Sequence, residues 1–399
     1  MQAHSAVSST YGETSKGETM RYRELGRTGL EVSEIGFGAE WMDKKTPEEV
    51  RSVVARCEEA GVNLLDCWMP GPEVRSNLGA ALASTRERWI IQGHIGSTWQ
   101  NGQYVRTRDL DQARPAFEDL LARLGTDHVE LGMIHYVDDV DEFDAIMAGE
   151  FIAYVRALKE AGTIGHIGLS THSPEVAKRA ALCGEIEAIM FSVNPAFDLL
   201  PATTSLKTAF EFAYDDELKG MDPARAELYA LCEREGVGLT VMKGYAGGRL
   251  LSADASPFGV AMTPVQCIHY ALTRPAVASI LAGFSEPAHV DNAVAYETAS
   301  PEELDYASVL AAAPKHAYFG QCTYCGHCAP CSSGIDIAAV NKFYDLAVMA
   351  DVVPASLRAH YEALGTTAAD CTACAICEPR CPFGVPVSER MAQAAALFA

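Results

Sequence analysis

Short runs of mainly β-branched and aliphatic residues alternate with longer amphipathic stretches over most of the chain. Eight such runs can be read in order: VSEIGFGA, VNLLD, WIIQGH, VELGMIHY, HIGLS, AIMFSVN, GLTVMK and VASILAG. Each run suits one buried strand, and each stretch that follows suits one helix. Eight such units of about 35 residues predict an α/β fold, a parallel (β/α)8 TIM barrel.

The expected helix starts support this prediction. Five of them place a capping side chain directly before a proline, whose missing N–H costs nothing in a first helical turn. These pairs are Thr46-Pro47, Ser173-Pro174, Asp222-Pro223, Thr263-Pro264 and Ser300-Pro301. Three of the five also have Glu or Gln three residues later, which predicts capping boxes with Glu49, Gln266 and Glu303.

The length of 399 residues suits one large domain and one small one. We expect a loose polar tail at 1–19, the barrel at 20–313, and a second, mostly helical domain at 314–399. Within the barrel, the stretch 198–222 is too long for an ordinary connection, which predicts a lid or a docking surface.

Composition and charge narrow the class of protein. The net charge of -22 disfavours nucleic acid as a partner, and it suits a soluble, basic redox partner, although it also serves solubility. No uninterrupted apolar run is long enough for a membrane span, and the first residues lack the apolar centre of a signal peptide. We therefore expect a soluble, cytoplasmic protein.

Eight of the thirteen cysteines are concentrated in two short segments, CTYCGHCAPC and CTACAICEPRCP. The second segment has the C-x2-C-x2-C-x3-C-P spacing of bacterial ferredoxins, and the first is one residue shorter in its last gap. This spacing predicts two 4Fe-4S clusters and disfavours structural zinc, which usually takes cysteines in two separated pairs. The predicted ligands are Cys322, Cys325, Cys328, Cys331, Cys371, Cys374, Cys377 and Cys381.

Polar residues stand where the predicted strands end. In a barrel these ends meet at one mouth, where the βα loops build the site, so we expect a small-molecule substrate to bind there. The residues are Asp66, His94, His135, Ser170, Thr171, His172, Asn194, Lys243 and Ser285.

The sequence resembles the aldo/keto reductase family, and in particular its branch with a C-terminal 4Fe-4S ferredoxin-like domain. The resemblance rests on YRELGRTGLEVSEIGFG, LGTDHVELGMIHYVD, GTIGHIGLS, VMKGYAGGRLL and GFSEPAHVDNAVAY. It implies reduction of carbonyl groups with NADPH, by a tetrad of Asp, Tyr, Lys and His at the barrel mouth.

Two members of that tetrad are present and two are replaced. Asp66 and His135 match the family's Asp and His, whereas Gly71 stands at the place of the Tyr and His94 at the place of the Lys. A carboxylate stabilises a protonated imidazole beside it, so an Asp66 and His94 pair could still deliver a proton. Tyr104 and Tyr136 are both candidates for the missing acid. The alternative is that the site has decayed and these residues are structural.

The resemblance also implies a nucleotide site in the loops after the seventh and eighth strands, where backbone N–H groups hold phosphates. The expected cofactor-binding residues are Ser170, Asn194, Lys243, Gly247, Gly248, Gly283, Ser285 and Asn292. A basic residue for the adenosine phosphate is not obvious, because His289 stands about where an Arg is expected. The resemblance nevertheless makes NADP(H) a possible cofactor.

In two-cluster ferredoxins the fourth cysteine of a segment commonly binds the other cluster. This rule gives one ligand set of Cys322, Cys325, Cys328 and Cys381, and a second of Cys371, Cys374, Cys377 and Cys331. We therefore predict an oxidoreductase whose clusters pass electrons between a redox partner, such as a ferredoxin or flavoprotein, and the barrel mouth. The alternative is a non-catalytic electron-transfer or assembly subunit that uses the barrel as a binding platform.

Overall fold

The computed structural model describes residues 20–211, 218, 220–313, 318–350 and 352–399, so the expected tail at 1–19 lies outside the described residues. The predicted barrel is confirmed: eight parallel strands close into one sheet. Its strands, in sheet order, are β3 (Ile35–Gly38), β4 (Leu64–Cys67), β5 (Ile90–Ile95), β8 (Val129–Ile134), β9 (Ile164–Thr171), β10 (Ala188–Ser192), β11 (Gly238–Met242) and β12 (Val277–Gly283).

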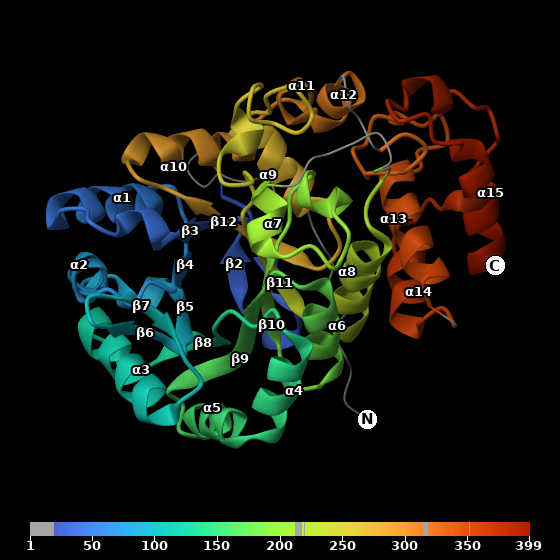
Figure 1. Ribbon diagram of the computed structural model, residues 1–399. Coiled ribbons are helices and arrows are strands. Elements are labelled where there is room, and N and C mark those ends of the chain that lie inside the picture. The colour runs from blue at the N-terminus through green and yellow to red at the C-terminus, as the bar shows by residue number, and fades with distance from the viewer. Residues whose placement is uncertain (1–19, 212–217, 219, 314–317, 351) are drawn as a thin grey trace.

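Helices surround this barrel, as Figure 1 shows. They are α1 (Pro47–Glu59), α2 (Pro72–Leu82), α3 (Leu110–Leu124), α4 (Val140–Ala148), α5 (Glu150–Glu160), α6 (Pro174–Leu182), α8 (Pro223–Glu235), α9 (Pro264–Leu272) and α10 (Pro287–Val294), followed by the short α11 (Pro301–Leu304) and α12 (Tyr306–Ala311). All five predicted capping residues stand at helix N-caps, and the three capping boxes are formed. Local capping therefore sets where these helices begin.

The barrel interior explains where the polar side chains go. Side chains alternate between the two faces of a strand, so Leu64 and Asp66 of β4 share one face. Leu64, Leu131 and Met133 belong to one apolar cluster, together with residues from four other strands. An apolar layer thus fills the barrel, and the polar residues of the same faces lie above it at the C-terminal ends of the strands.

Two hairpins were not predicted. The first joins β1 (Tyr22–Glu24) to β2 (Glu31–Ser33), so the run predicted as one strand at 32–39 is divided at Glu34. The second joins β6 (Ser97–Gln100) to β7 (Gln103–Arg106) directly after β5. Its turn residues Asn101 and Gly102 both have positive φ (52° and 78°), as a two-residue hairpin turn of type I′ requires.

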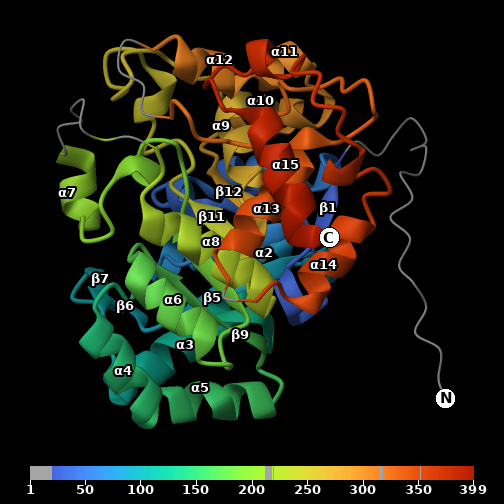
Figure 2. The same cartoon turned by 90° about the vertical axis from the view of Figure 1, so that its right-hand side faces the viewer.

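The C-terminal part is helical, as predicted. It contains α13 (Ile337–Val348), α14 (Ala355–Glu362) and α15 (Val387–Phe398), and Pro354 is the N-cap of α14. Figure 2 shows α13, α14 and α15 lying together beside the barrel. The hydroxyl of Tyr306 donates to the carbonyl of Thr323 (2.6 Å), which ties the cysteine segment to the barrel.

The long stretch at 198–222 begins with a buried anchor. It contains η4 (Phe197–Leu199) and α7 (Leu206–Glu211), while residues 212–217 and 219 lie outside the described residues. The Asp198 carboxylate accepts hydrogen bonds from the hydroxyls of Tyr229 (2.6 Å) and Tyr270 (2.7 Å) and pairs with Arg225. A role as lid or docking surface therefore stays a prediction for the part that follows this anchor.

Among the described residues, the helices are all too short or too polar to cross a membrane.

Candidate functional site

Asp66 and His94 are in direct contact at the mouth of the barrel. They lie on the neighbouring strands β4 and β5, and His94 Nε2 is 2.8 Å from Asp66 Oδ1. Gln92, two residues before His94 and on the same face of β5, donates its amide N–H to the same carboxylate oxygen (3.0 Å). Both members of the pair are almost completely buried.

His94 continues the chain of contacts through its other ring nitrogen. His94 Nδ1 is 2.8 Å from Nδ1 of His135, which follows β8. His135 Nε2 is in turn 2.8 Å from the hydroxyl of Tyr104, on β7. Asp66, His94, His135 and Tyr104 therefore form one continuous hydrogen-bonded chain, which we call the relay chain. It runs from a buried carboxylate to a phenol that is 36% exposed.

The surroundings favour a neutral His135. Burial, followed by the charges of His94 and Arg108, holds the pKa of His135 well below its ordinary value. Burial also raises the pKa of Tyr104, although Arg106 opposes that rise, so the phenol keeps its proton near neutral pH. The indole of Trp68 lies parallel to the His135 ring, with centroids 5.8 Å apart, and covers one side of it.

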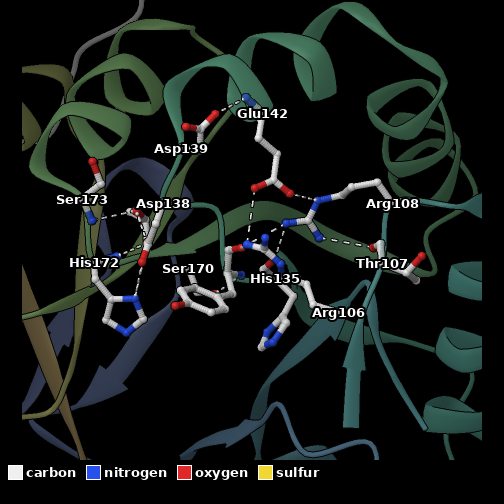
Figure 3. Close-up of polar contacts among 12 residues, drawn as sticks. Arg106, Thr107, Arg108, His135, Asp138, Asp139, Glu142, Ser170, His172 and Ser173 are labelled. Atoms are coloured by element: carbon white, nitrogen blue, oxygen red, sulfur yellow. Dashed lines mark hydrogen bonds and ion pairs between the residues drawn. The ribbon is translucent and has the colours of Figure 1, made fainter. Parts of the chain in front are cut away.

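Two arginines from the second hairpin and the loop after it fix the backbone beside His135. Arg108 donates to the carbonyls of His135 (2.6 Å) and Tyr136 (3.1 Å), and Arg106 donates to the carbonyl of Tyr136 (2.6 Å). Glu142 of α4 forms ion pairs with Arg106 (3.3 Å) and Arg108 (3.0 Å). Figure 3 shows both guanidinium groups between Glu142 and the His135 backbone. The hairpin that carries Tyr104 is thus attached firmly to the end of β8.

Tyr136, the other candidate acid, lies outside the relay chain. Its backbone has a positive φ (48°), and its N–H donates to Ser170 Oγ (2.7 Å). Its ring meets the ring of His172 edge to face, and His172 Nδ1 is 3.0 Å from Asp138 Oδ2. The predicted residues Ser170 and His172 therefore support and border Tyr136.

The other predicted cofactor residues shape the backbone around the mouth. Asn194 is fully buried, and it donates to the Lys243 carbonyl (2.9 Å) and accepts from the Phe197 N–H (2.8 Å). Lys243, Gly247 and Gly248 all have positive φ, so the loop after β11 is tightly turned. Asn194 thus holds this loop in place through its backbone.

The segment after β12 offers a partial fit to a nucleotide. The indole of Trp41 packs directly against Gly283. A Cβ atom at this position would lie 2.6 Å from the indole atoms, so only glycine fits there. Ser285 Oγ is 3.1 Å from His289 Nδ1, and α10 begins two residues after Ser285. The helix N-terminus suits a phosphate, and Asn292 of α10 is exposed. The charged groups from Ser285 to Asn292 are carboxylates, apart from His289, so this segment lacks a cation for an adenosine phosphate.

The eight clustered cysteines separate into two quartets. One small cavity is lined by Cys322, Cys325, Cys328 and Cys381, and another by Cys331, Cys371, Cys374 and Cys377. This division matches the two ligand sets expected from the ferredoxin rule. Within the described residues, no three His, Cys, Asp or Glu side chains converge on a point that would hold a single metal ion. A cubane differs in this respect, because each cysteine binds its own iron at a separate corner.

The backbone around both cavities suits iron-sulfur ligation. Tyr324, Ala373 and Ala375 have positive φ, and each lies between two cysteines of one quartet. The N–H of Ala373 donates to Cys371 Sγ, and the N–H of Val385 donates to Cys381 Sγ, both at 3.4 Å. Hydrogen bonds to sulfur are one of the means by which proteins tune a cluster's reduction potential.

The two quartets face different surroundings. Thr323, next to Cys322, accepts hydrogen bonds from Tyr306 and Arg274 of the barrel, and His327 pairs with Asp305 (3.0 Å). In the other quartet Cys374 is exposed, and the neighbouring Ile376 is 51% exposed. We call the first the barrel-side quartet and the second the outer quartet.

Comparison with known proteins identifies the class. The model of the aldo/keto reductase family matches residues 34–263, more than half of the chain, and a 4Fe-4S dicluster domain matches residues 321–386. The chain therefore belongs to the aldo/keto reductase family and carries a 4Fe-4S dicluster domain that includes all eight clustered cysteines. The resemblance seen in the motifs is confirmed.

Individual relatives are more distant. The uncharacterized oxidoreductase YqkF of Bacillus subtilis (strain 168) is 28% identical over 186 residues, covering 46% of this chain and 58% of YqkF. The 6-dehydroglucose reductase of Novosphingobium aromaticivorans is 28% identical over 210 residues, covering 44% of this chain and 66% of that protein. The chain thus spans less than two thirds of each of these curated relatives.

Among solved structures, the holo form of aldo-keto reductase AKR11C1 from Bacillus halodurans has a similar fold. Its TM-score is 0.56 at 23% identity, and the match covers 71% of this chain and 94% of that one. At this identity the likeness supports the barrel fold alone.

Proposed function

We propose that this protein is an iron-sulfur oxidoreductase whose two 4Fe-4S clusters pass electrons between a redox partner and a site at the barrel mouth. The observation that carries the proposal is the division of eight cysteines into two cavities of four, on the same chain as an aldo/keto reductase barrel. The residues present fit two cubanes, because each cavity offers four sulfurs, turned backbone between them and N–H groups aimed at sulfur.

The position of the quartets suggests an order for the electrons. The outer quartet is open to solvent at Cys374, so a partner can approach it closely. The barrel-side quartet lies against Tyr306 and Arg274, which belong to the barrel. Electrons would enter or leave at the outer cluster and exchange with the barrel through the other one. The net charge of -22 suits a partner with a basic docking face.

The proposed substrate class is a small carbonyl compound. Carbonyl reduction is the chemistry of the family, and one relative bears the name 6-dehydroglucose reductase. A nicotinamide dinucleotide bound at the loops after β11 and β12 would supply a hydride. Gly247 and Gly248 would border its phosphates. The segment from Ser285 to Asn292 carries carboxylates, which disfavour the additional adenosine phosphate that distinguishes NADPH from NADH. NADH therefore deserves testing beside NADPH.

One observation favours the non-catalytic alternative. The resemblance puts Gly71 and His94 at the places of the family's Tyr and Lys, and Gly71 is the N-cap of α2. A barrel that had lost its acid could still bind a partner and carry clusters. The relay chain favours the catalytic function, because it places the phenol of Tyr104, from β7, at the mouth beside His135.

Anaerobic turnover separates the two functions. Reduced methyl viologen and, separately, NADH or NADPH serve as donors, and benzaldehyde and other aldehydes and ketones without nitro groups serve as acceptors. We expect alcohol formation with both kinds of donor. Cys371→Ser is expected to stop turnover driven by viologen and to leave turnover driven by the nicotinamide. No turnover with any donor across the panel would favour the binding platform.

A further inference from the structure

We propose that Tyr104 is the proton donor of the barrel site and that Asp66, His94 and His135 reload it through a concerted switch of hydrogen-bond direction. This inference rests on the proposed function and deepens it by naming the acid. The acid is supplied by the hairpin of β6 and β7, and His135 works inside the relay chain instead of on the substrate.

His135 has no ring nitrogen left to bond a substrate. Both ring nitrogens are used, one by His94 and one by Tyr104, each at 2.8 Å. His135 is 6% exposed, whereas Tyr104 is 36% exposed. Tyr104 is thus the most exposed of the four residues in the relay chain.

Each contact in the chain needs one donor and one acceptor, which allows two complete arrangements when His135 is neutral and Asp66 is a carboxylate. In the unloaded arrangement Tyr104 donates to His135 Nε2, His135 donates from Nδ1 to His94, and His94 donates from Nε2 to the Asp66 carboxylate. In the loaded arrangement His94 carries two protons beside that carboxylate and donates from Nδ1 to His135. His135 then donates from Nε2 to the Tyr104 oxygen, whose own proton is turned to the substrate.

The two arrangements differ by one proton, so the reaction balances. Reduction of a carbonyl by a hydride leaves an alkoxide, and the Tyr104 O–H bond breaks as the new O–H bond of the alcohol forms. Tyr104 takes the Nε2 proton of His135, and His135 takes the Nδ1 proton of His94. His94 ends neutral, still bonded to Asp66. For the next turnover a solvent proton binds at the Tyr104 oxygen, and the same transfers run in reverse until His94 again carries two protons.

The structure holds the chain in alignment. Tyr104 is the second residue of β7, two residues after the tight Asn101-Gly102 turn, and Arg106 of the same strand is bonded to the Tyr136 carbonyl. The low pKa of His135 keeps it neutral in both arrangements. The Asp66 carboxylate, 2.8 Å from His94 Nε2, is the group placed to balance a second proton on His94. The other charged or titratable groups around the chain are Arg106, Arg108, Tyr136, Glu142 and His172.

Nitrogen-15 NMR of the histidine rings tests this switch without a substrate. The full chain, with its clusters oxidised, is titrated from about pH 9 to about pH 5, and the ring signals are assigned with His94→Gln and His135→Gln. We expect His135 to move its single proton from Nδ1 to Nε2 within this pH range. A network that is only structural would leave His135 in one tautomer throughout, and that result would overturn the proposal.

Variants sharpen the test. Asp66→Asn is expected to abolish the tautomer switch of His135 above about pH 5, because the carboxylate that balances His94 is lost. Tyr154→Phe removes a hydroxyl from α5, away from the chain, and should leave the switch unchanged. An unchanged switch in Asp66→Asn would overturn the proposed chain. Iron and sulfide analysis of the same samples reports on the clusters separately, so failure of the proposed cluster function is distinguishable from failure of the switch.

Discussion

The barrel mouth and the cysteine segments place reactive side chains in opposite ways. At the mouth, Asp66, His94 and His135 bond one another inside the fold, and each is at most 6% exposed. In the cysteine segments the sulfurs of each quartet line a cavity, and Cys374 is exposed. The mouth is therefore complete as a protein structure, whereas the cysteine segments are completed only by a bound cluster. On the proposed function, the side chains of the mouth suffice for proton transfer, while electron storage in the cysteine segments requires an added group.

The largest effect is expected from breaking the outer quartet. Cys371→Ala should lower the iron content from about eight to about four atoms per chain, because one cubane loses a ligand and the other keeps its own four. Cys267→Ala, in the buried face of α9, is the matched control and should leave the iron content unchanged. Loss of all iron or of none from Cys371→Ala would contradict the division into two independent quartets.

The next largest effect concerns the phenol at the mouth. Tyr104→Phe should lower NADPH- or NADH-driven reduction of benzaldehyde by about a hundredfold, since a lost general acid typically has that cost. The iron content should not change, because the mouth and the quartets are separate structures. Tyr154→Phe serves as control. A large loss with Tyr136→Phe, and little with Tyr104→Phe, would assign the acid to the other tyrosine.

A double-mutant cycle tests whether Asp66 and His94 act as one unit. Asp66→Asn and His94→Gln should each reduce turnover by a similar factor, and the double variant should be little slower than either. The physical reason is that both changes remove the same stored proton. If the two losses multiply in steady-state kinetics, the residues act independently and the relay account of the mouth is wrong.

The smallest effect is expected at the support of the mouth. Glu142→Gln removes the charge that pairs with Arg106 and Arg108, whose side chains are 37% and 19% exposed. Ion pairs at such partly exposed positions contribute about 1 kcal/mol or less, so turnover should fall by about fivefold at most. Because the backbone carbonyls remain bonded to both arginines, a loss as large as that of Tyr104→Phe would show that Glu142 acts in the chemistry itself.

Much of the fold could be predicted because its signals are local. The eight apolar runs and the five proline-capped helix starts depend on neighbouring residues. The structure has a barrel strand in each run, the first divided at Glu34, and a helix at each of the five starts. The approach of Asp66 to His94 followed from adjacent strand ends in a barrel. The division of the cysteines followed in the same way from spacing.

The contacts that the sequence did not reveal depend on one hairpin. The pair Asn101-Gly102 is a strong signal for a two-residue turn, and it could have predicted β6 and β7. It could not have predicted that this hairpin lies across the mouth and brings Tyr104 to His135. That placement depends on Arg106 and Arg108 reaching the backbone beside His135, a contact between distant segments that no local pattern encodes.

The account depends most on the two clusters, and their metal content tests it directly. Full-length protein purified without oxygen should contain about eight iron atoms and about eight acid-labile sulfides per chain, as two cubanes require. Zinc should be absent at stoichiometric amounts in the same preparation. Stoichiometric zinc without sulfide would contradict the assignment, and the eight cysteines would then be a structural metal site beside a barrel that works alone.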